Sequence, residues 1–414
     1  MSGLVQADAV ELPVADDTVD LVITSPPYFA LRSYRDDGEH YDGQIGSEAT
    51  PQEFLDALWA VTSECVRVLK PSGSLWVNLG DKYSSGSSGV SNLAALGQRL
   101  GSGGGHSDAK AKHASPPVAG FRTKSLLGLP WRYAIGCIDD LGLILRAEVI
   151  WSKPNGLPES VTDRVRRSHE QWFHFTLEPR YFSAIDEIRE PQKEPERSTG
   201  AIESKGDKAT TAKVHNLNVN AAYTGEMPRA YNPLGKLPGS VWSIPSEPLQ
   251  VPDDLGVDHF AAFPQEWPRR LILGWCPAEV CTACGEGRAP VVDKELVDVW
   301  HDKPPASSKH AGTKDAHRNT YYGQKDTFGR TAATITGYAC ACPDTTAPST
   351  PGVVLDPFAG TGTVPMVARA LGRTGIGVDL SADYLRLAAW RVFESGHASK
   401  TVARTNGERQ GLLL

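Results

Sequence analysis

Two short segments near opposite ends of the 414-residue chain carry residues that could bind a ligand or take part in catalysis. Residues 353–363 read VVLDPFAGTGT, which predicts a strand, a glycine-rich turn and then a helix over 364–371. Gly360 and Gly362 let the backbone turn sharply and approach a ligand, which a Cβ would prevent. Asp356 closes the strand at the carboxyl edge of the predicted sheet, where α/β proteins bind ligands.

The next predicted strand, residues 375–378, ends at a second acidic residue, Asp379. A carboxylate at this position can accept hydrogen bonds from ribose hydroxyls, as in dinucleotide-binding folds. The phosphate-binding fingerprint is incomplete, because no third glycine follows at the usual spacing and no Gly-Lys-Ser/Thr occurs. The segment therefore predicts a cofactor with a nucleoside but no pyrophosphate. The alternative is a plain glycine turn between a strand and a helix.

The other segment, Ser25-Pro26-Pro27-Tyr28, directly follows an apolar strand predicted over 19–23. Two prolines remove two backbone donors and fix φ, so the loop is stiff and offers carbonyl acceptors. Tyr28 adds a flat aromatic face beside them. Such a loop can hold an amino group on a flat ring, which the carbonyls bind while the tyrosine stacks. In isolation, the simpler interpretation is a turn with a packed tyrosine.

The elements around these segments predict an α/β fold. Residues 52–69 carry apolar residues at helical spacing, and a strand over 75–77 follows the Pro71-Ser72-Gly73 stop. This β–α–β order favours a parallel sheet. A further helix is expected over 126–141 and a strand over 145–151. Residues 84–120 are rich in Ser, Gly and Lys and are expected to form a mobile loop.

The composition permits DNA as a substrate without indicating it, because the net charge is −7 and only local clusters are basic. These clusters comprise Arg99, Lys110, Lys112, Arg122 and Lys124, and then Arg164, Arg166 and Arg167. They could equally be solvated loop charges. No apolar stretch reaches the roughly 20 residues that span a bilayer, and no secretory signal pattern is visible at 1–13. We therefore expect a cytoplasmic protein with reduced cysteines.

Taken together, Ser25-Pro26-Pro27-Tyr28 and Asp356 to Thr363 resemble the permuted DNA amino-methyltransferases, which are specific for cytosine N4 or adenine N6. The order of the two motifs, with the catalytic loop ahead of the cofactor loop, is that of the permuted group. Further matching segments are the Asp8 region, Trp151 to Asn155, Pro158 to Val161, Arg167 to Glu170 and His259 to Pro264. The resemblance implies a Rossmann-like methyltransferase fold with S-adenosylmethionine as cofactor and double-stranded DNA as substrate.

The same resemblance implies the roles of the site residues. Ser25, Pro26, Pro27 and Tyr28 would receive a flipped base, and the carbonyls of Ser25 and Pro26 would stabilise charge that develops on its amino nitrogen. The residues that would bind the cofactor are Asp356, Phe358, Gly360, Thr361 and Gly362 around methionine, Asp379 at the ribose, and Asp8, His259, Phe263 and Pro264 around adenine. No Pro-Cys pair occurs, which argues against cytosine-C5 chemistry.

Seven cysteines are present, and four of them form two close doublets. Cys281 and Cys284 have the C-x-x-C spacing that presents two thiolates to one metal ion, and Cys340 and Cys342 could supply two more. We therefore expect a zinc site of four cysteines in an inserted zinc ribbon. Unligated thiols, or ligation shared with His301, His310 or His317, are the alternatives.

The expected organisation places two halves of one catalytic domain around insertions. The parts are a catalytic half (1–183), a target-recognition region (184–240), a cofactor-pocket segment (241–280), a zinc-binding insertion (281–345) and a cofactor-binding half (346–414). Enzymes that resemble this one more often carry Ser at the position of Ser25 when cytosine is the target, so the resemblance favours cytosine N4 over adenine N6. The enzyme would serve beside a restriction endonuclease or act alone. The rival functions are an RNA or protein amino-methyltransferase and a non-enzymatic zinc-ribbon DNA-binding protein.

Overall fold

The computed structural model describes residues 2–30, 35–36, 39–40, 44–84, 118–156, 158–159, 161–191, 232–249, 263–300, 328–344 and 346–394. His259, the three histidines at 301, 310 and 317, and most of the expected loop 84–120 and of the region 184–240 lie outside these residues. The chain forms two compact units. The larger comprises 1–188, 239–289 and 338–414, and the smaller comprises 189–238 and 290–337.

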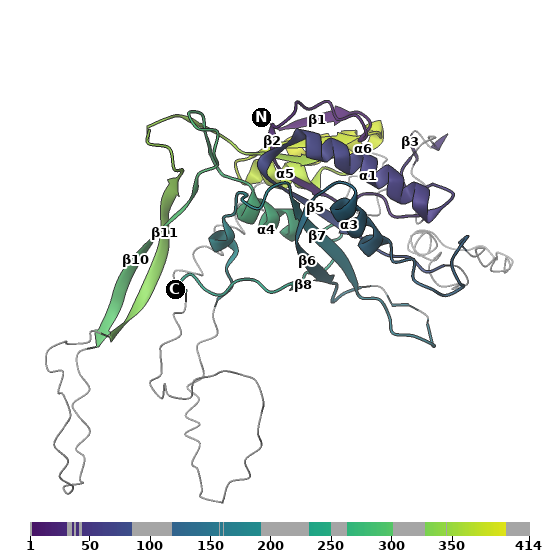
Figure 1. Cartoon of the computed structure of the whole chain (residues 1–414), viewed down its shortest axis with the longest axis horizontal. Coiled ribbons are helices and arrows are strands. Elements are labelled where there is room, and N and C mark those ends of the chain that lie inside the picture. Colours follow the sequence, from purple (N-terminus) through teal and green to yellow (C-terminus); the bar gives the residue numbers. More distant parts are fainter. Residues whose placement is uncertain are drawn as a thin grey trace, which may run out of the picture. The chain divides into compact units, whose positions relative to one another are not determined.

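An eight-stranded mixed sheet with the order β1-β14-β13-β2-β5-β7-β6-β8 lies at the centre of the larger unit (Figure 1). Its strands are β1 (Gly3–Gln6), β2 (Val19–Thr24), β5 (Leu69–Leu79), β6 (Ile144–Ser152), β7 (His169–Thr176), β8 (Val241–Ser243), β13 (Val353–Asp356) and β14 (Thr374–Asp379). All neighbours are parallel except β7, which runs against both β5 and β6. The expected α/β fold is confirmed, but the sheet is mixed because β7 is reversed.

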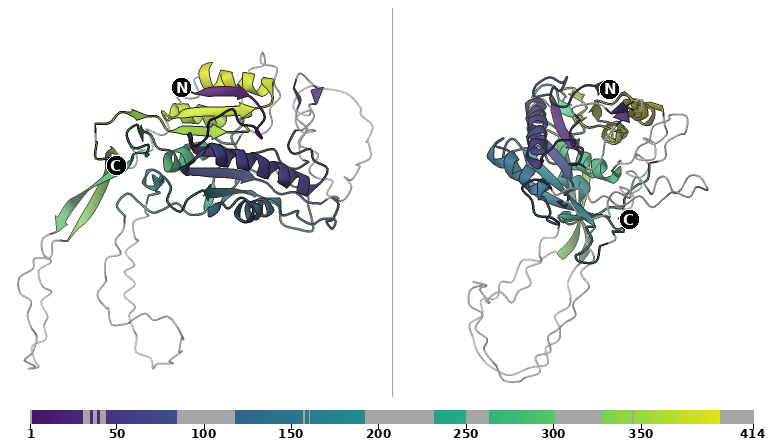
Figure 2. Two further views of the ribbon diagram at one scale, coloured as in Figure 1. Left: turned by 45° about the horizontal axis from the view of Figure 1, so that its top comes forward. Right: turned by 90° about the vertical axis from the view of Figure 1, so that its right-hand side faces the viewer.

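Helices cover both faces of this sheet (Figures 1 and 2). They are α1 (Pro51–Val68), α3 (Leu129–Asp139), α4 (Glu266–Trp275), α5 (Thr363–Ala370) and α6 (Ala382–Ala389), with short turns at η1 (Ile185–Ile188) and η3 (Trp390–Glu394). Residues of α1 and α3 share one apolar core with the sheet, and residues of α4 and α5 share another. In the part of the chain that the structure describes, no helix has the length and hydropathy to cross a bilayer.

Helix α1 forms where the sequence predicts it. The Thr50 hydroxyl accepts from the Glu53 N–H, and the Glu53 carboxylate accepts from the Thr50 N–H, so the two cap the first turn reciprocally. Its apolar face, which includes Phe54 and Leu58, is buried. The predicted end is wrong by one residue: Leu69 already belongs to β5, which runs on through Pro71-Ser72-Gly73. Because β5 pairs with β2 at both ends of this segment, tertiary pairing overrides the local stop signal.

A group of stacked tryptophans fills the core on the α4 side. The ring of Trp267 stacks on Trp172 with centroids 4.7 Å apart and on Trp242 with centroids 4.9 Å apart. Trp151 meets Trp267 edge-on. These residues come from β7, β8, α4 and β6, so this core joins the antiparallel end of the sheet to its covering helix.

Among the described residues, three two-stranded ladders lie outside the large sheet. They are β3 (Arg35–Asp36) with β4 (Glu39–His40), β9 (Val280–Cys281) with β12 (Ser349–Thr350), and β10 (Ala289–Trp300) with β11 (Phe328–Ala339). The β10–β11 pair makes up much of the insertion expected over 281–345. Cys281 lies in β9, and Cys340 directly follows β11.

The packing of α5 on β14 predicts the effect of one added methyl group. A Cβ at Gly375 would lie 2.6 Å from the Pro365 Cα, which is backbone that cannot rotate away. Gly375→Ala should therefore lower the free energy of unfolding by about 1–3 kcal/mol. Gly3→Ala is the matched control on β1, because its Cβ would meet nothing within 4 Å. Thermal unfolding of both variants checks this, and equal melting temperatures would contradict the close approach.

Candidate functional site

The two predicted motifs meet at one point on the carboxyl edge of the sheet. Strands β2 and β13 are parallel neighbours, with Leu355 opposite Val22. The Thr24 hydroxyl at the end of β2 donates to Asp356 Oδ1 at the end of β13, over 2.9 Å. Both residues are buried. One hydrogen bond therefore joins positions 332 residues apart and holds the two loops side by side.

Asp356 is fixed and desolvated. Its Oδ1 also accepts from the Phe358 N–H over 3.1 Å. Burial nevertheless raises the pKa of the Asp356 carboxyl to about 7. Pro26 and Phe358, from the two loops, line the same small cavity as Thr24. A cationic group bound beside Asp356 would favour the ionised form of its carboxyl.

The glycine-rich turn is ordered by the second predicted carboxylate. Asp379 at the end of β14 accepts from the Gly360 N–H over 2.7 Å and from the Ser381 N–H over 2.9 Å. Gly362 has φ +72°, and a Cβ there would lie 2.8 Å from Ala388 Cβ on α6. Gly362 is therefore required by both conformation and packing.

Arg391 binds the glycine-rich turn through hydrogen bonds. This contact was not predicted from the sequence. Its guanidinium donates to the Thr361 carbonyl and to the Thr363 hydroxyl, each over 2.9 Å. The side chain is buried, and this burial lowers the pKa of Arg391 to about 10. Nothing in the local sequence indicates this contact, because Arg391 lies in η3, about 30 residues beyond the turn.

The tyrosine of the Pro-Pro-Tyr loop is held by its hydroxyl. Tyr28 Oη lies 2.8 Å from Asn78 Oδ1 and 2.9 Å from Glu170 Oε2. The Ser25 hydroxyl donates to the same Asn78 oxygen over 3.1 Å, while the Asn78 amide donates to the Gln171 carbonyl. Strands β5 and β7 thus supply the acceptors that fix the direction of the loop.

Two further features restrict the Tyr28 ring. Glu170 forms an ion pair with Lys153, whose ammonium lies 4.0 Å from the centroid of the Trp151 ring. A Cβ at Gly80 would lie 2.6 Å from Tyr28 Cε2, so glycine leaves room for the ring. Glu170 and Lys153 belong to segments that the resemblance already matched, whereas the contacts of Asn78 and Gly80 were not foreseen.

Fewer contacts define the positions of the remaining cofactor residues that were predicted from the sequence. Asp8 is exposed and follows Ala7, whose N–H donates to the Asp379 carbonyl over 3.2 Å. Asp8 therefore lies at the same sheet edge as Asp379. Phe263 packs edge-on against Trp172, and Pro264 is buried at the start of α4. The structure thus places Phe263 on the tryptophan core.

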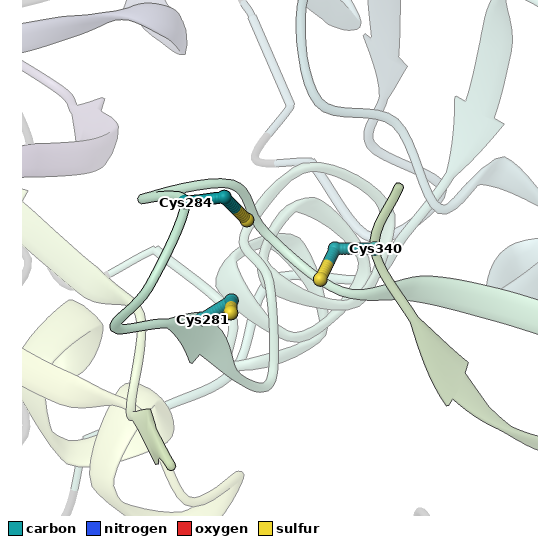
Figure 3. Close-up of side chains that lie close together, drawn as sticks. All are labelled: Cys281, Cys284 and Cys340. Atoms are coloured by element: carbon teal, nitrogen blue, oxygen red, sulfur yellow. The ribbon is translucent and has the colours of Figure 1, made fainter. Parts of the chain in front are cut away.

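Three of the four predicted metal ligands lie together. The sulfur atoms of Cys281, Cys284 and Cys340 all lie within 4.8 Å of one another (Figure 3). Cys342 is described but is not part of this group. In the structure the C-x-x-C turn therefore contributes two sulfur atoms to the group and the C-x-C doublet contributes one.

Comparison with known proteins shows which family the chain matches. The family described as DNA methylase (N6_N4_Mtase) matches residues 19–279 and 345–389. The type II methyltransferase M.XycI of Xanthomonas campestris pv. cyanopsidis is 39% identical over 193 residues, which cover 46% of this chain and 59% of that protein. M.SmaI of Serratia marcescens is 35% identical over 225 residues, which cover 53% of this chain and 68% of that protein.

Among solved structures, the PvuII DNA methyltransferase (cytosine-N4-specific) aligns with a TM-score of 0.49 and 16% identity, over 99% of this chain and 93% of that one. The chain spans less than two thirds of the length of M.XycI. The family match itself covers most of the chain, including the Pro-Pro-Tyr loop and the glycine-rich turn. The chain therefore belongs to the N6/N4 DNA methylase family.

Proposed function

We propose that the protein transfers the methyl group of S-adenosylmethionine to the exocyclic amino group of a base in double-stranded DNA. The observation that carries this proposal is the Thr24–Asp356 hydrogen bond, which holds a loop suited to an amino group against a turn suited to a nucleoside cofactor. Membership of the DNA methylase family supports the same chemistry.

The residues around the glycine-rich turn fit S-adenosylmethionine. Asp356, Phe358, Gly360, Thr361 and Gly362 would surround its methionine part. The buried Asp356 carboxyl suits a ligand that carries a sulfonium and an ammonium group. Gly360 and Gly362 both have positive φ, and the absence of side chains lets the backbone approach the ligand. Bound there, the cofactor supplies a methyl group already activated by the sulfonium.

Asp379 would bind the ribose. It ends β14, next to the strand that ends at Asp356, and the N–H groups of Gly360 and Ser381 fix its carboxylate. Asp8, at the same edge, would lie near the adenine. The resemblance also assigns His259, Phe263 and Pro264 to the adenine side of the pocket, although Phe263 packs against Trp172 in the structure.

The loop from Ser25 to Tyr28 would hold the target base after the base leaves the duplex, since an amino group engaged in pairing cannot be reached. The carbonyls of Ser25 and Pro26 would accept from the amino N–H groups and stabilise positive charge as the nitrogen attacks the methyl group. Tyr28 would stack on the base, and Asn78, Glu170 and Gly80 would set the plane of its ring. The side chains thus orient the reactants, and no covalent enzyme intermediate is needed.

The order of the strands supports the permuted architecture. Strands β13 and β14 come from the C-terminal part of the chain, but they lie between β1 and β2. The cofactor loop therefore follows the catalytic loop in sequence while lying beside it in space. A chain with this motif order can form the site only if its last strands insert into the middle of the sheet.

We also propose a biological role for the enzyme and a region that recognises its target sequence. The relatives M.XycI and M.SmaI are type II methyltransferases, which supports a role beside a restriction endonuclease. We place the enzyme in the cytoplasm, as the sequence predicts. Residues 184–240 are the proposed target-recognition region. We treat zinc, the second bound group expected from the sequence, as a structural ion outside the methyl-transfer chemistry.

Cytosine N4 is the proposed target atom, with adenine N6 as the alternative. Cytosine and adenine both carry an amino group beside a ring nitrogen, so the two loop carbonyls can hold either base. Ser25 favours cytosine by resemblance. The proposal of DNA amino methylation does not depend on this choice.

Labelled methyl transfer tests the proposed reaction. Incubation with methyl-labelled S-adenosylmethionine should label mixed-sequence DNA but not transfer RNA or a protein mixture. Digestion of the DNA to nucleosides and mass analysis should give N4-methyldeoxycytidine. Only N6-methyldeoxyadenosine would overturn the choice of base, whereas label confined to RNA or protein would overturn the DNA substrate.

Substitutions should separate base binding from cofactor binding. Tyr28→Ala removes a stacking contact worth about 1–3 kcal/mol, so kcat/KM for DNA should fall roughly 5- to 150-fold with an unchanged cofactor Kd. Tyr28→Phe keeps the ring and loses only its hydroxyl contacts, so kcat/KM for DNA should fall less in this variant. Asp356→Ala should instead raise the cofactor Kd. Calorimetric titration measures this, and equal losses of cofactor affinity in the Tyr28 and Asp356 variants would contradict the division.

The raised pKa of Asp356 predicts a pH dependence of cofactor binding. Below pH 7 the Asp356 carboxyl is protonated and neutral, so it attracts the cationic cofactor less. Affinity should therefore rise as the pH is raised through 7, by up to about tenfold per pH unit below that value. Asp356→Asn is the matched control, since it keeps the shape without titrating. The same pH profile in both proteins would rule out Asp356 as the titrating group.

A further inference from the structure

We propose that Cys281, Cys284 and Cys340 form the preassembled part of a structural metal site that takes zinc. The three thiols come from two segments more than 50 residues apart in the chain, yet their sulfur atoms all lie within 4.8 Å of one another. They point toward a common centre (Figure 3). All three are free thiols. Sulfur atoms that converge from two separate segments suit one shared soft cation.

The turn between Cys281 and Cys284 has the backbone of a metal-binding knuckle. The Gly285 N–H donates to the Cys281 carbonyl over 2.8 Å, and Gly285 has φ +73°. This left-handed glycine lets the chain reverse directly after the doublet, so the sulfur atoms of Cys281 and Cys284 lie within 4.8 Å of each other.

The knuckle is anchored on both sides. Cys281 pairs with Ser349 in the β9–β12 ladder, and the Thr282 N–H donates to the Pro348 carbonyl over 3.0 Å. The Arg288 guanidinium donates to the Ala347 carbonyl and also interacts with the Cys340 side chain. A cation beside Cys340 offsets the negative charge that several thiolates on one divalent ion would leave.

Zinc fits this donor set best. Thiolate sulfur selects soft or borderline metals, and structural zinc sites are tetrahedral with closed coordination. The fourth position falls to Cys342, which is partly exposed and only two residues beyond Cys340. A local rearrangement of residues 341–342 would bring its sulfur to the metal.

The position of the site indicates what the ion does. Cys284 precedes β10 and Cys340 follows β11, so the metal would tie together the two ends of the inserted hairpin. The DNA methylase family match leaves residues 280–344 uncovered, so the cluster is an addition to the shared core. Metal loss should therefore loosen the insertion and leave the cofactor site, which contains none of these cysteines, intact.

Metal analysis of the purified full-length protein tests the proposal directly. It should give about one zinc per chain. Replacement of zinc by cobalt(II) should produce thiolate-to-cobalt charge-transfer absorption together with the visible bands of tetrahedral cobalt. Chelation should increase protease cleavage within 285–339 while the Kd for S-adenosylmethionine stays unchanged. Protein without metal, or cobalt(II) spectra without thiolate bands, would overturn the site.

Single substitutions test the ligand set. Cys281→Ser, Cys284→Ser and Cys340→Ser should each abolish stoichiometric metal, whereas Cys342→Ser should bind it more weakly but still detectably. Cys137→Ala is the control, since this buried cysteine lies on α3 and should leave the metal content unchanged. Full metal content in all three of the first variants would refute the site. If those variants are insoluble, the cobalt spectrum of the wild-type protein decides by itself.

Discussion

The site depends on one buried carboxyl group, that of Asp356, at the point where the ends of strands β2 and β13 meet. Asp356 is almost wholly removed from solvent, and the polar contacts resolved around its Oδ1 are the Thr24 hydroxyl and the Phe358 N–H. Loss of a hydrogen-bond partner by a buried polar or charged group costs about 1–3 kcal/mol or more. The end of β2 must therefore lie beside the end of β13. This pairing determines where the loop that follows each strand lies.

The rest of the larger unit can be understood as support for this junction. On one side, Arg391 and Asp379 hold the glycine-rich turn through its backbone and hydroxyl groups. On the other, Asn78 and Glu170 hold the Pro-Pro-Tyr loop through side-chain hydroxyls. Both sets of contacts are made by the protein's own groups. Such preorganisation is what electrostatic stabilisation of a transition state requires, because dipoles already in place need not reorganise during the reaction.

Local patterns predicted the elements that carry the site. Helix α1, strand β2 and the β13–α5–β14 unit follow from apolar spacing, caps and glycines that lie within the elements themselves. The reversed strand β7 was not predicted, because His169, Glu170 and Gln171 begin it with polar residues and its direction depends on pairing with β5 and β6. The contacts of Asn78 and Arg391 were missed for the same reason, since they join residues from distant parts of the chain. The cysteine spacing predicted three ligands that the fold brings together, but it could not show that Cys342 lies outside the group.

We propose that the Pro-Pro-Tyr loop and the glycine-rich turn form a single reaction site at the ends of β2 and β13. A crystal structure of the protein with S-adenosylhomocysteine and a DNA duplex carrying its methylation sequence tests this most directly. We expect a flipped base stacked on Tyr28, with its amino nitrogen within hydrogen-bond distance of the Ser25 carbonyl and facing the cofactor sulfur beside Asp356. A base bound elsewhere, or a cofactor away from the turn at 356–362, would contradict it.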